Sequence, residues 1–242
     1  MNEIGKRKKI SIANWGKWAS LLIGVFYFAI GVLMIFDPAE KYRGIEYLKQ
    51  LYAHPLIPHL WRYMFVAVAF ITILWISAAD VVIRRKSYEA EGLYKWVKFL
   101  GYTAAVISAI QWYKEIFQWD FLKDFATKND TYTSLISAIG VGIDPDYLWM
   151  FGALGAWYLV SSILAQKHKI FSKATNVFGI LSGVALLFTM IFAMTDTIVY
   201  FPDGSQMAVM QFTALLGGVC GGFYHIIAFF SINKSIKEMI EE

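Results

Sequence analysis

The distribution of apolar and polar residues divides this chain into long uncharged runs separated by short polar segments. A transmembrane helix needs about 20 mostly apolar residues, and runs of this kind recur along the whole sequence. The six predicted spans cover residues 18–36, 60–83, 97–117, 147–166, 177–201 and 208–232. Strand-like alternation is absent, and backbone groups in lipid need partners within their own segment, so helices are expected. We therefore predict an all-α, polytopic membrane protein with six transmembrane helices in one bundle, a single transmembrane domain over residues 1–242.

Two segments between the spans have the periodicity of a helix but not the length to cross a membrane. The apolar residues of Lys41 to Tyr52 fall on one face, and those of Phe117 to Phe125 do the same. Both segments are predicted to be short interfacial helices in the outer loops. The apolar stretch from Thr133 to Ile143 is also too short to span and is predicted to be re-entrant, interfacial or packed on the bundle.

The composition supports the membrane class. The chain of 242 residues is 58% hydrophobic and only 17% charged, whereas soluble domains carry roughly 25% charged residues. The net charge of +4 is not gathered into a dense basic domain outside the flanks of the spans, so no nucleic-acid partner is expected. The basic start before a long apolar run, without a small-residue cleavage site, predicts an uncleaved signal anchor.

The placement of lysine and arginine predicts the orientation. About two thirds of the 22 basic residues fall on the side that holds the N-terminus, the loops after spans two and four, and the C-terminus. Basic residues are enriched in the cytoplasmic loops of membrane proteins. We therefore expect both termini to lie in the cytoplasm and the chain to be a multi-pass protein of the cell's inner membrane.

Small residues at four-residue spacing mark two spans as close-packing helices. They are Gly217, Gly218, Gly221 and Gly222 in the last span, and Gly179 and Gly183 in the fifth. Such pairs let a neighbouring helix approach closely. Gln211, Gly218, Gly222 and His225 fall on one narrow stripe of the last span, because their spacings are close to whole helical turns. We predict that this span contacts another helix through Gly218 and Gly222, with the Gly179/Gly183 face as the partner.

Polar residues at the outer ends of the spans form a candidate pocket. They are Arg62, Gln111, Lys114, Glu115, Asp196 and Gln211, which the predicted topology brings to one membrane depth. Ionisable residues inside a membrane are costly, so they are functional candidates. The set is either an outer pocket for an ion, a headgroup or a small solute, or a group of interfacial salt bridges and snorkelling side chains. In both cases Arg62 and Asp196 are expected to face the bundle and to pair with each other, or with Glu115 and Lys114.

Two further ionisable residues lie deeper in the spans. Asp80 lies four residues before Arg84, and an ion pair at the cytoplasmic boundary accounts for it. His225 is the only histidine well inside a span. A hydrogen bond to a neighbouring helix is its expected role, because a haem with two axial imidazoles would need a second histidine at matching depth.

No cofactor, metal site or catalytic centre is predicted. His54 and His59, separated by a segment with two prolines, match no pattern of zinc or copper ligands. An integral membrane enzyme would need a buried cluster of acids, bases or metal ligands, and the sequence has none. An enzymatic activity is therefore not expected.

The order of features resembles a bacterial six-span membrane family of unknown function. The basic N-terminus precedes the first span, and an outer loop carries a short helix. The aromatic–arginine pair Trp61–Arg62 opens the second span, and the short basic loop KHKIFSKATNVFGILSG joins spans four and five. The resemblance implies the six-span layout and supplies no activity.

Two functions from different classes remain open. The first is a non-enzymatic accessory subunit or scaffold that binds lipid, a hydrophobic ligand or partner helices, and the aromatic content and the glycine pairs favour it. The second is a small-solute or ion transporter whose site is the outer polar pocket. Transporters usually show discontinuous helices and inverted repeats, and the sequence shows neither clearly.

Overall fold

A computed structural model of the chain describes residues 3–39, 44–85, 91–126, 144, 147–200 and 206–241. The helices are α1 (Glu3–Phe36), α2 (Gly44–Ala53), α3 (Leu56–Arg84), α4 (Glu91–Ala126), the π-helical segment η2 (Leu148–Ala153), α6 (Leu154–Lys167), α7 (Lys173–Met194) and α8 (Val209–Glu241). Two short strands, β1 (Ile198–Tyr200) and β2 (Gln206–Ala208), pair antiparallel between α7 and α8. The all-α class predicted from the sequence is confirmed.

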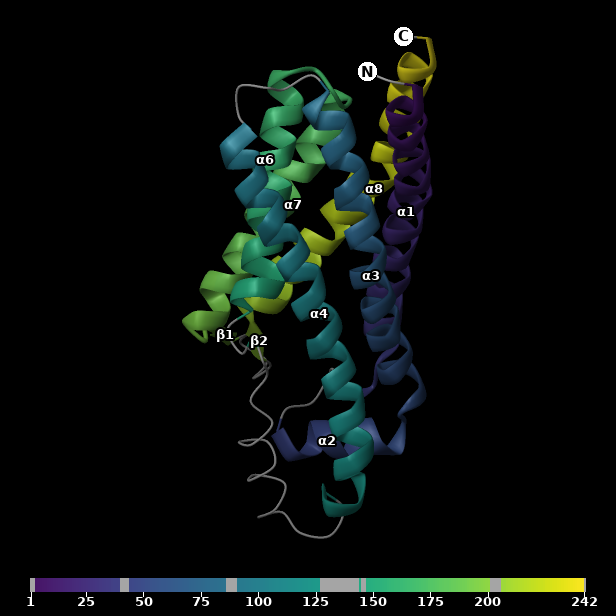
Figure 1. Cartoon of the computed structure of the whole chain (residues 1–242). Helices are drawn as coiled ribbons and strands as arrows, with labels where there is room; N and C mark the ends of the chain where they lie inside the picture. The colour runs from purple at the N-terminus through teal and green to yellow at the C-terminus, as the bar shows by residue number, and fades with distance from the viewer. Residues whose placement is uncertain are drawn as a thin grey trace.

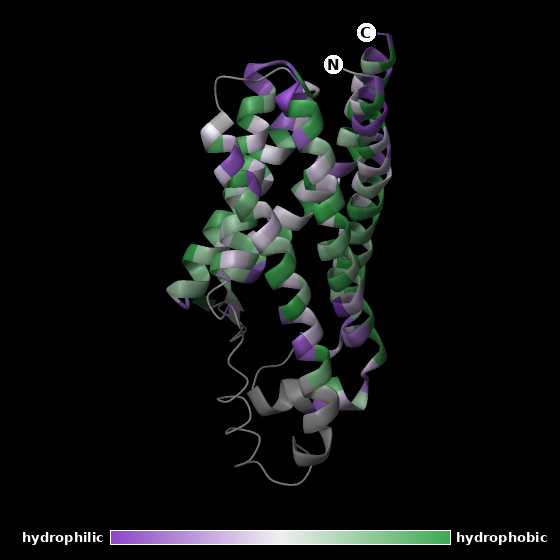
Figure 2. Cartoon of the chain, in the orientation of Figure 1, coloured by the Kyte–Doolittle hydropathy of each residue, from purple (hydrophilic) through white to green (hydrophobic). Residues whose placement is uncertain are grey.

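Five helices are long and apolar enough to cross a membrane within the described ranges. They are α1, α3, η2 continued by α6, α7 and α8. Figure 2 shows hydrophobic residues along the middle of these helices and hydrophilic ones towards the ends where the two termini lie. The protein therefore has the character of a multi-pass membrane protein. The predicted third span, residues 97–117, lies within α4, which is less apolar than the other five.

The ends of several helices differ from the predicted spans. α1 begins at Glu3 because the basic N-terminal segment is helical as well, and it packs beside the end of α8, where the Lys6 ammonium donates to the Ile240 carbonyl at 3.2 Å. The predicted fifth span is too long. α7 ends at Met194, and Asp196 takes the left-handed conformation with φ 44°. The apolar residues that follow form β1, since β-branched and aromatic side chains suit a strand.

Of the two short helices predicted between the spans, one is present as a separate helix and the other is not. The helix predicted over residues 41–52 is present as α2, which lies crosswise at the lower ends of the long helices in Figure 1. The separate helix predicted over residues 117–125 is wrong, because α4 continues without a break to Ala126. The stretch from Thr133 to Ile143 lies outside the described residues.

The long helices pack side by side in chain order. α1 packs on α3, α3 on α4, α4 on η2 and α6, and α6 on α7, while α7 packs on α8, which returns to α1. Figure 1 shows α1 and α8 running alongside each other, with the two termini close together at one end. The contact between the first and last helices brings residues about 200 positions apart in the sequence into one interior.

Glycines set the closest approaches, although not in the predicted pairs. A Cβ atom at Gly183 would lie 2.8 Å from the carbonyl oxygen of Gly155, so the two glycines join α6 to α7. Gly217 faces Leu186 of α7, and Gly222 faces Phe28 of α1. These contacts let backbones approach closely.

The prediction that Gly218 and Gly222 meet the Gly179/Gly183 face is wrong. Nothing lies within 4 Å of a Cβ atom built at Gly218. Gly179 packs against Ser162 of α6 and Tyr224 of α8, and Gly221 faces Ser182 of α7. The error arises because α8 crosses between α7 and α1, so that neighbouring glycines on α8 face different helices.

A pair of glycine variants tests this packing. Gly183→Leu should lower stability by about 1–3 kcal/mol or more, because its side chain has no space between α6 and α7. Gly218→Leu should leave stability close to that of the wild type, since its Cβ meets open space. Thermal unfolding in mild detergent measures both. Equal losses for the two variants would contradict the described contacts.

Candidate functional site: a buried histidine and an outer ion pair

The side chain of His225 lies in the middle of α8 and is completely buried. Its imidazole sits among aromatic rings from three helices. The ring centroid of Trp75 on α3 lies 5.3 Å away, that of Tyr158 on α6 lies 5.7 Å away, and that of Tyr27 on α1 lies 6.0 Å away. The imidazole is therefore the meeting point of α1, α3, α6 and α8.

Hydrogen bonds fix the protonation of this imidazole. The Ser20 hydroxyl has one proton and donates it to the backbone carbonyl of His225 at 2.7 Å. The Ser20 oxygen also lies 3.3 Å from Nδ1, so it accepts a hydrogen bond from the N–H at that nitrogen. Nε2 then carries the lone pair and accepts from the Tyr158 hydroxyl at 2.5 Å. Every polar group of a neutral imidazole is satisfied in this arrangement.

This network confirms the helix-to-helix role predicted for His225 and extends it. Ser20 belongs to α1 and Tyr158 to α6, so one side chain on α8 joins three helices. An unsatisfied polar group buried in a dry interior costs about 1–3 kcal/mol. Loss of either partner would leave one imidazole nitrogen without a bond, which makes the network sensitive to single substitutions.

The outer polar cluster consists of Arg62, Glu115 and Gln111. Arg62 of α3 is buried, and its Nε lies 3.4 Å from Oε2 of Glu115 on α4. Gln111 donates to the other oxygen of Glu115 at 3.1 Å. The guanidinium also donates to the Pro58 carbonyl at 3.0 Å. The expected pairing of Arg62 with Glu115 is confirmed.

Arg62 also stacks on the indole of Trp61, its neighbour in the aromatic–arginine pair. Its guanidinium carbon lies 3.7 Å from the centroid of Trp61. The Trp61 indole donates to a buried carboxylate oxygen of Asp37 at 2.8 Å, and the Asp37 carboxylate also accepts from the Ala39 amide. The sequence assigned Asp37 no role in this cluster. Asp37 directly follows the first predicted span and Trp61 opens the second, and this shared position is the signal that could have revealed the pair.

The other residues of the predicted outer pocket are not all brought together. Asp196 lies beyond the end of α7 and is exposed, and it forms no ion pair within the described ranges. Asp196 was expected to face the bundle and to pair there with Arg62 or with Lys114, and this is wrong, because α7 ends before Asp196 instead of carrying it inward. Lys114 and Gln211 are half-buried.

The end of the bundle where the termini lie has its own ion pairs. Asp80 lies 4.0 Å from Arg84, as the sequence predicts, but its closer partner is Lys98 of α4 at 3.0 Å. Arg85 lies 3.7 Å from Glu238 on α8. The Lys98 contact ties α3 to α4, and the Arg85 contact ties α3 to α8.

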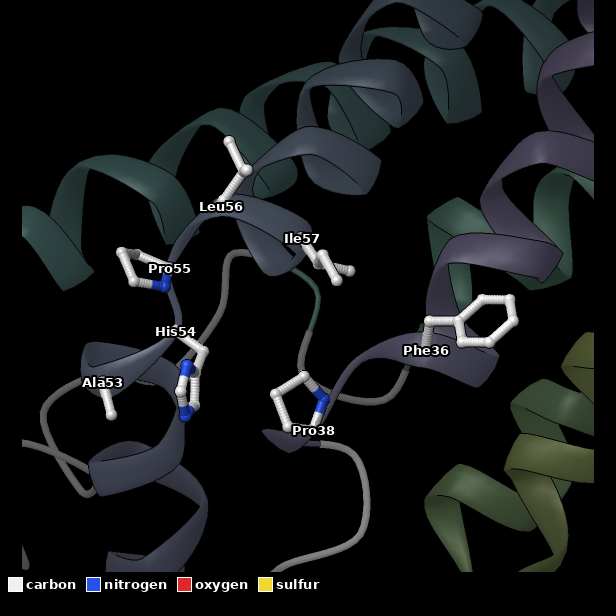
Figure 3. Close-up of a pocket in the computed structure, with 7 residues that line it drawn as sticks. All are labelled: Phe36, Pro38, Ala53, His54, Pro55, Leu56 and Ile57. Atoms are coloured by element: carbon white, nitrogen blue, oxygen red, sulfur yellow. The ribbon is translucent and has the colours of Figure 1, made fainter.

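A shallow groove lies at the end of the bundle away from the termini, between the end of α1 and the turn that joins α2 to α3. It has a volume of about 510 Å³ and is lined by Phe36, Pro38, Ala53, His54, Pro55, Leu56 and Ile57. Figure 3 shows these side chains around an open space, with His54 the one ionisable group among them. Among the residues that the structure describes, no group of three or more histidine, cysteine, aspartate or glutamate side chains is placed to hold a metal ion.

Comparisons with known protein families, with curated proteins and with solved structures found no match. The interpretation of the site therefore depends on the geometry alone.

Tyr158→Phe tests the histidine network. The variant keeps the ring and removes the hydroxyl, so Nε2 of His225 loses its donor and stability should fall by about 1–3 kcal/mol. Tyr63→Phe is the matched control, because Tyr63 is half exposed on α3, and a change there should stay within about 0.5 kcal/mol. Equal stability of the two variants in detergent unfolding would show that the His225 bond contributes nothing.

Proposed function

We propose that this protein is a non-enzymatic six-span membrane protein, an accessory subunit or scaffold that holds a hydrophobic partner at its outer end. The proposal rests on an interior filled by large aromatic side chains and on an open apolar groove at one end of the bundle. Trp75, Trp157, Tyr158 and Tyr224 are among the largest completely buried side chains, whereas the groove at the turn between α2 and α3 is open and mostly apolar.

The proposed sixth span is α4, and the exposed face of that helix supports it. Large apolar side chains recur along this face at spacings of three, four or seven residues, namely Trp96, Phe99, Val106, Ile110, Tyr113 and Phe117. The distance from Trp96 to Phe117 is about 32 Å along a helix, close to the ~30 Å thickness of the hydrocarbon core. Its polar side chains, Lys98, Gln111 and Glu115, pair instead with neighbouring groups.

The proposed orientation places both termini in the cytoplasm of a bacterial cell, with the groove outside. The ends of α1 and α8 that lie together carry lysines on both helices, among them Lys6 and Lys237. Basic residues favour the cytoplasmic side. The resemblance to a bacterial six-span family is part of the same proposal.

Three single-cysteine variants test the spans and the orientation together. A membrane-impermeant thiol reagent applied to intact cells should label His54→Cys at the groove and spare Lys169→Cys in the inner loop. Lys169→Cys should react once the membrane is opened. Val106→Cys on the apolar face of α4 should stay unlabelled in both conditions while the bilayer is intact, because lipid covers it. Native Cys220 is buried and serves as the background.

Two results would contradict these proposals. Labelling of Lys169→Cys from outside, with protection of His54→Cys, would reverse the orientation. Rapid labelling of Val106→Cys in sealed membranes would place α4 in water, and the sixth span would be lost.

The groove fits an apolar chain better than a hydrated solute. Its lining is mostly proline and aliphatic side chains, and it is shallow and open instead of enclosing. Leu56 and Phe36, on its rim, are strongly exposed. A lipid acyl chain at the outer membrane boundary would cover these side chains, and burial of apolar surface contributes roughly 25 cal/mol per Å².

The second candidate is a transporter that uses the outer polar cluster. The buried pair of Arg62 and Glu115 favours it, because charges inside a membrane often mark a solute or ion path. Against it, the path inward from Arg62 meets the stacked rings of Phe65 and Trp112, whose centroids are 4.8 Å apart. A rise in unfolding temperature with added ions or small solutes, lost in Arg62→Met, would support this candidate.

A matched pair of leucine variants tests the scaffold proposal. Leu56→Ser changes the rim of the groove, whereas Leu60→Ser changes an exposed leucine one turn later on α3. Native mass spectrometry of protein purified in mild detergent should show bound lipid on the wild type and on Leu60→Ser, and less on Leu56→Ser. Equal lipid on both variants would contradict lipid binding in the groove. Loss of a stoichiometric protein from Leu56→Ser would identify a partner helix as the occupant.

A further inference from the structure

Near His225, the interior contains polar side chains whose hydrogen-bonding atoms have no direct partner. The indole nitrogen of Trp75 and the hydroxyl of Tyr224 are both buried without a hydrogen bond to protein. Both side chains are completely buried. Each unsatisfied polar group is costly in a membrane interior, so a bound partner is expected.

These two groups lie close to each other without bonding directly. Their rings meet edge to face, with centroids 5.9 Å apart. The Tyr224 hydroxyl lies beside the Trp75 indole and the Ser161 hydroxyl, but neither the Trp75 nitrogen nor the Tyr224 oxygen has a direct partner with hydrogen-bonding geometry. Ser161 donates its proton to the Trp157 carbonyl at 2.6 Å, which leaves lone pairs on its oxygen. The cluster therefore offers an N–H donor, an acceptor oxygen and a hydroxyl that does either.

More polar atoms continue from this cluster towards the inner end of α7. The Ser162 hydroxyl is buried without a direct partner and would collide with a Cβ atom at Gly179. One turn earlier on α7, Asn176 uses its amide nitrogen on the Phe171 carbonyl, while its amide oxygen is unbonded. In contrast, the aromatic rings of Trp61, Phe65 and Trp112 pack together towards the outer end.

We infer that Trp75, Tyr224 and Ser161 bind ordered water in the core, beside the imidazole of His225. A buried water makes two to four hydrogen bonds to otherwise unsatisfied groups. Here it accepts from the Trp75 indole N–H and from the Tyr224 hydroxyl, and it donates to the oxygen of Ser161. The site is independent of the lipid groove, and it gives the inner half of the protein a hydrated centre.

Water-edited solid-state NMR of the intact protein in lipid bilayers tests the site. Magnetisation passes from water to nearby N–H groups, so its rate of build-up reports contact with water. The Trp75 indole N–H, assigned by its loss in Trp75→Phe, should build up several times faster than the backbone amide of Ala185, which is buried on α7. A rate at Trp75 equal to that at Ala185 would overturn the inference, and this includes the case of a direct bond from Trp75 to Tyr224.

Two serine variants sharpen the test. Ser161→Ala removes an acceptor of the proposed water and should slow the build-up at Trp75. Ser182→Ala also removes a completely buried serine hydroxyl, but that hydroxyl donates to the Gly217 carbonyl, so the rate at Trp75 should stay at the wild-type value. Equal effects of the two variants would contradict the assignment of Ser161. The wild-type measurement stands even if either variant fails to fold.

Discussion

The neutral imidazole of His225 is the interaction on which the helix arrangement depends. Its two nitrogens are of opposite type, one donor and one acceptor, and the surrounding helices supply one partner for each. The Ser20 hydroxyl oxygen on α1 accepts the hydrogen bond from the donor nitrogen, and the Tyr158 hydroxyl on α6 donates to the acceptor nitrogen. A rotation of α1, α6 or α8 about its axis would break one of these bonds and leave a buried polar group without its partner. The imidazole therefore fixes how the first and last helices meet.

Other contacts join the helices towards both ends of the bundle. At the end away from the termini, Arg62 and Glu115 join α3 to α4. At the end where the termini lie, Lys98 and Asp80 join the same two helices, and Arg85 reaches Glu238 on α8. Breaking a buried ion pair on one side leaves an uncompensated charge, so such pairs specify which helices are neighbours more than they add stability. Between the two ends, contact is made by aromatic rings and by glycines that admit close backbones.

The features that depend on composition and on the periodicity of apolar residues could be predicted from the sequence. The features that depend on which helices pack together could not. Long apolar runs were enough to place five helices and the all-α class. The cost of an unpaired charge in a membrane predicted that Arg62 would pair, but left both Asp196 and Glu115 open as its partner. The position of Asp196 was wrong, since apolar residues 198–200 extend the run although they form a strand. The contact predicted for Gly218 was wrong, because the spacing of glycines shows that a helix face is flat but not which helix packs on it. The Tyr158 and Ser20 partners of His225 lie on other helices, beyond the reach of local patterns.

The protonation state of the two His225 ring nitrogens is the most direct test of the hydrogen-bond network that joins α1, α6 and α8. Nitrogen-15 NMR of histidine-labelled protein in bilayers at neutral pH distinguishes protonated from unprotonated ring nitrogens, and His225→Asn identifies the signal. We expect a neutral ring with the proton on Nδ1 and a hydrogen-bonded, unprotonated Nε2. Tyr158→Phe should move the Nε2 signal and leave the Nδ1 proton in place. A proton on Nε2, or an Nε2 signal that is unchanged in Tyr158→Phe, would contradict the network that joins the three helices.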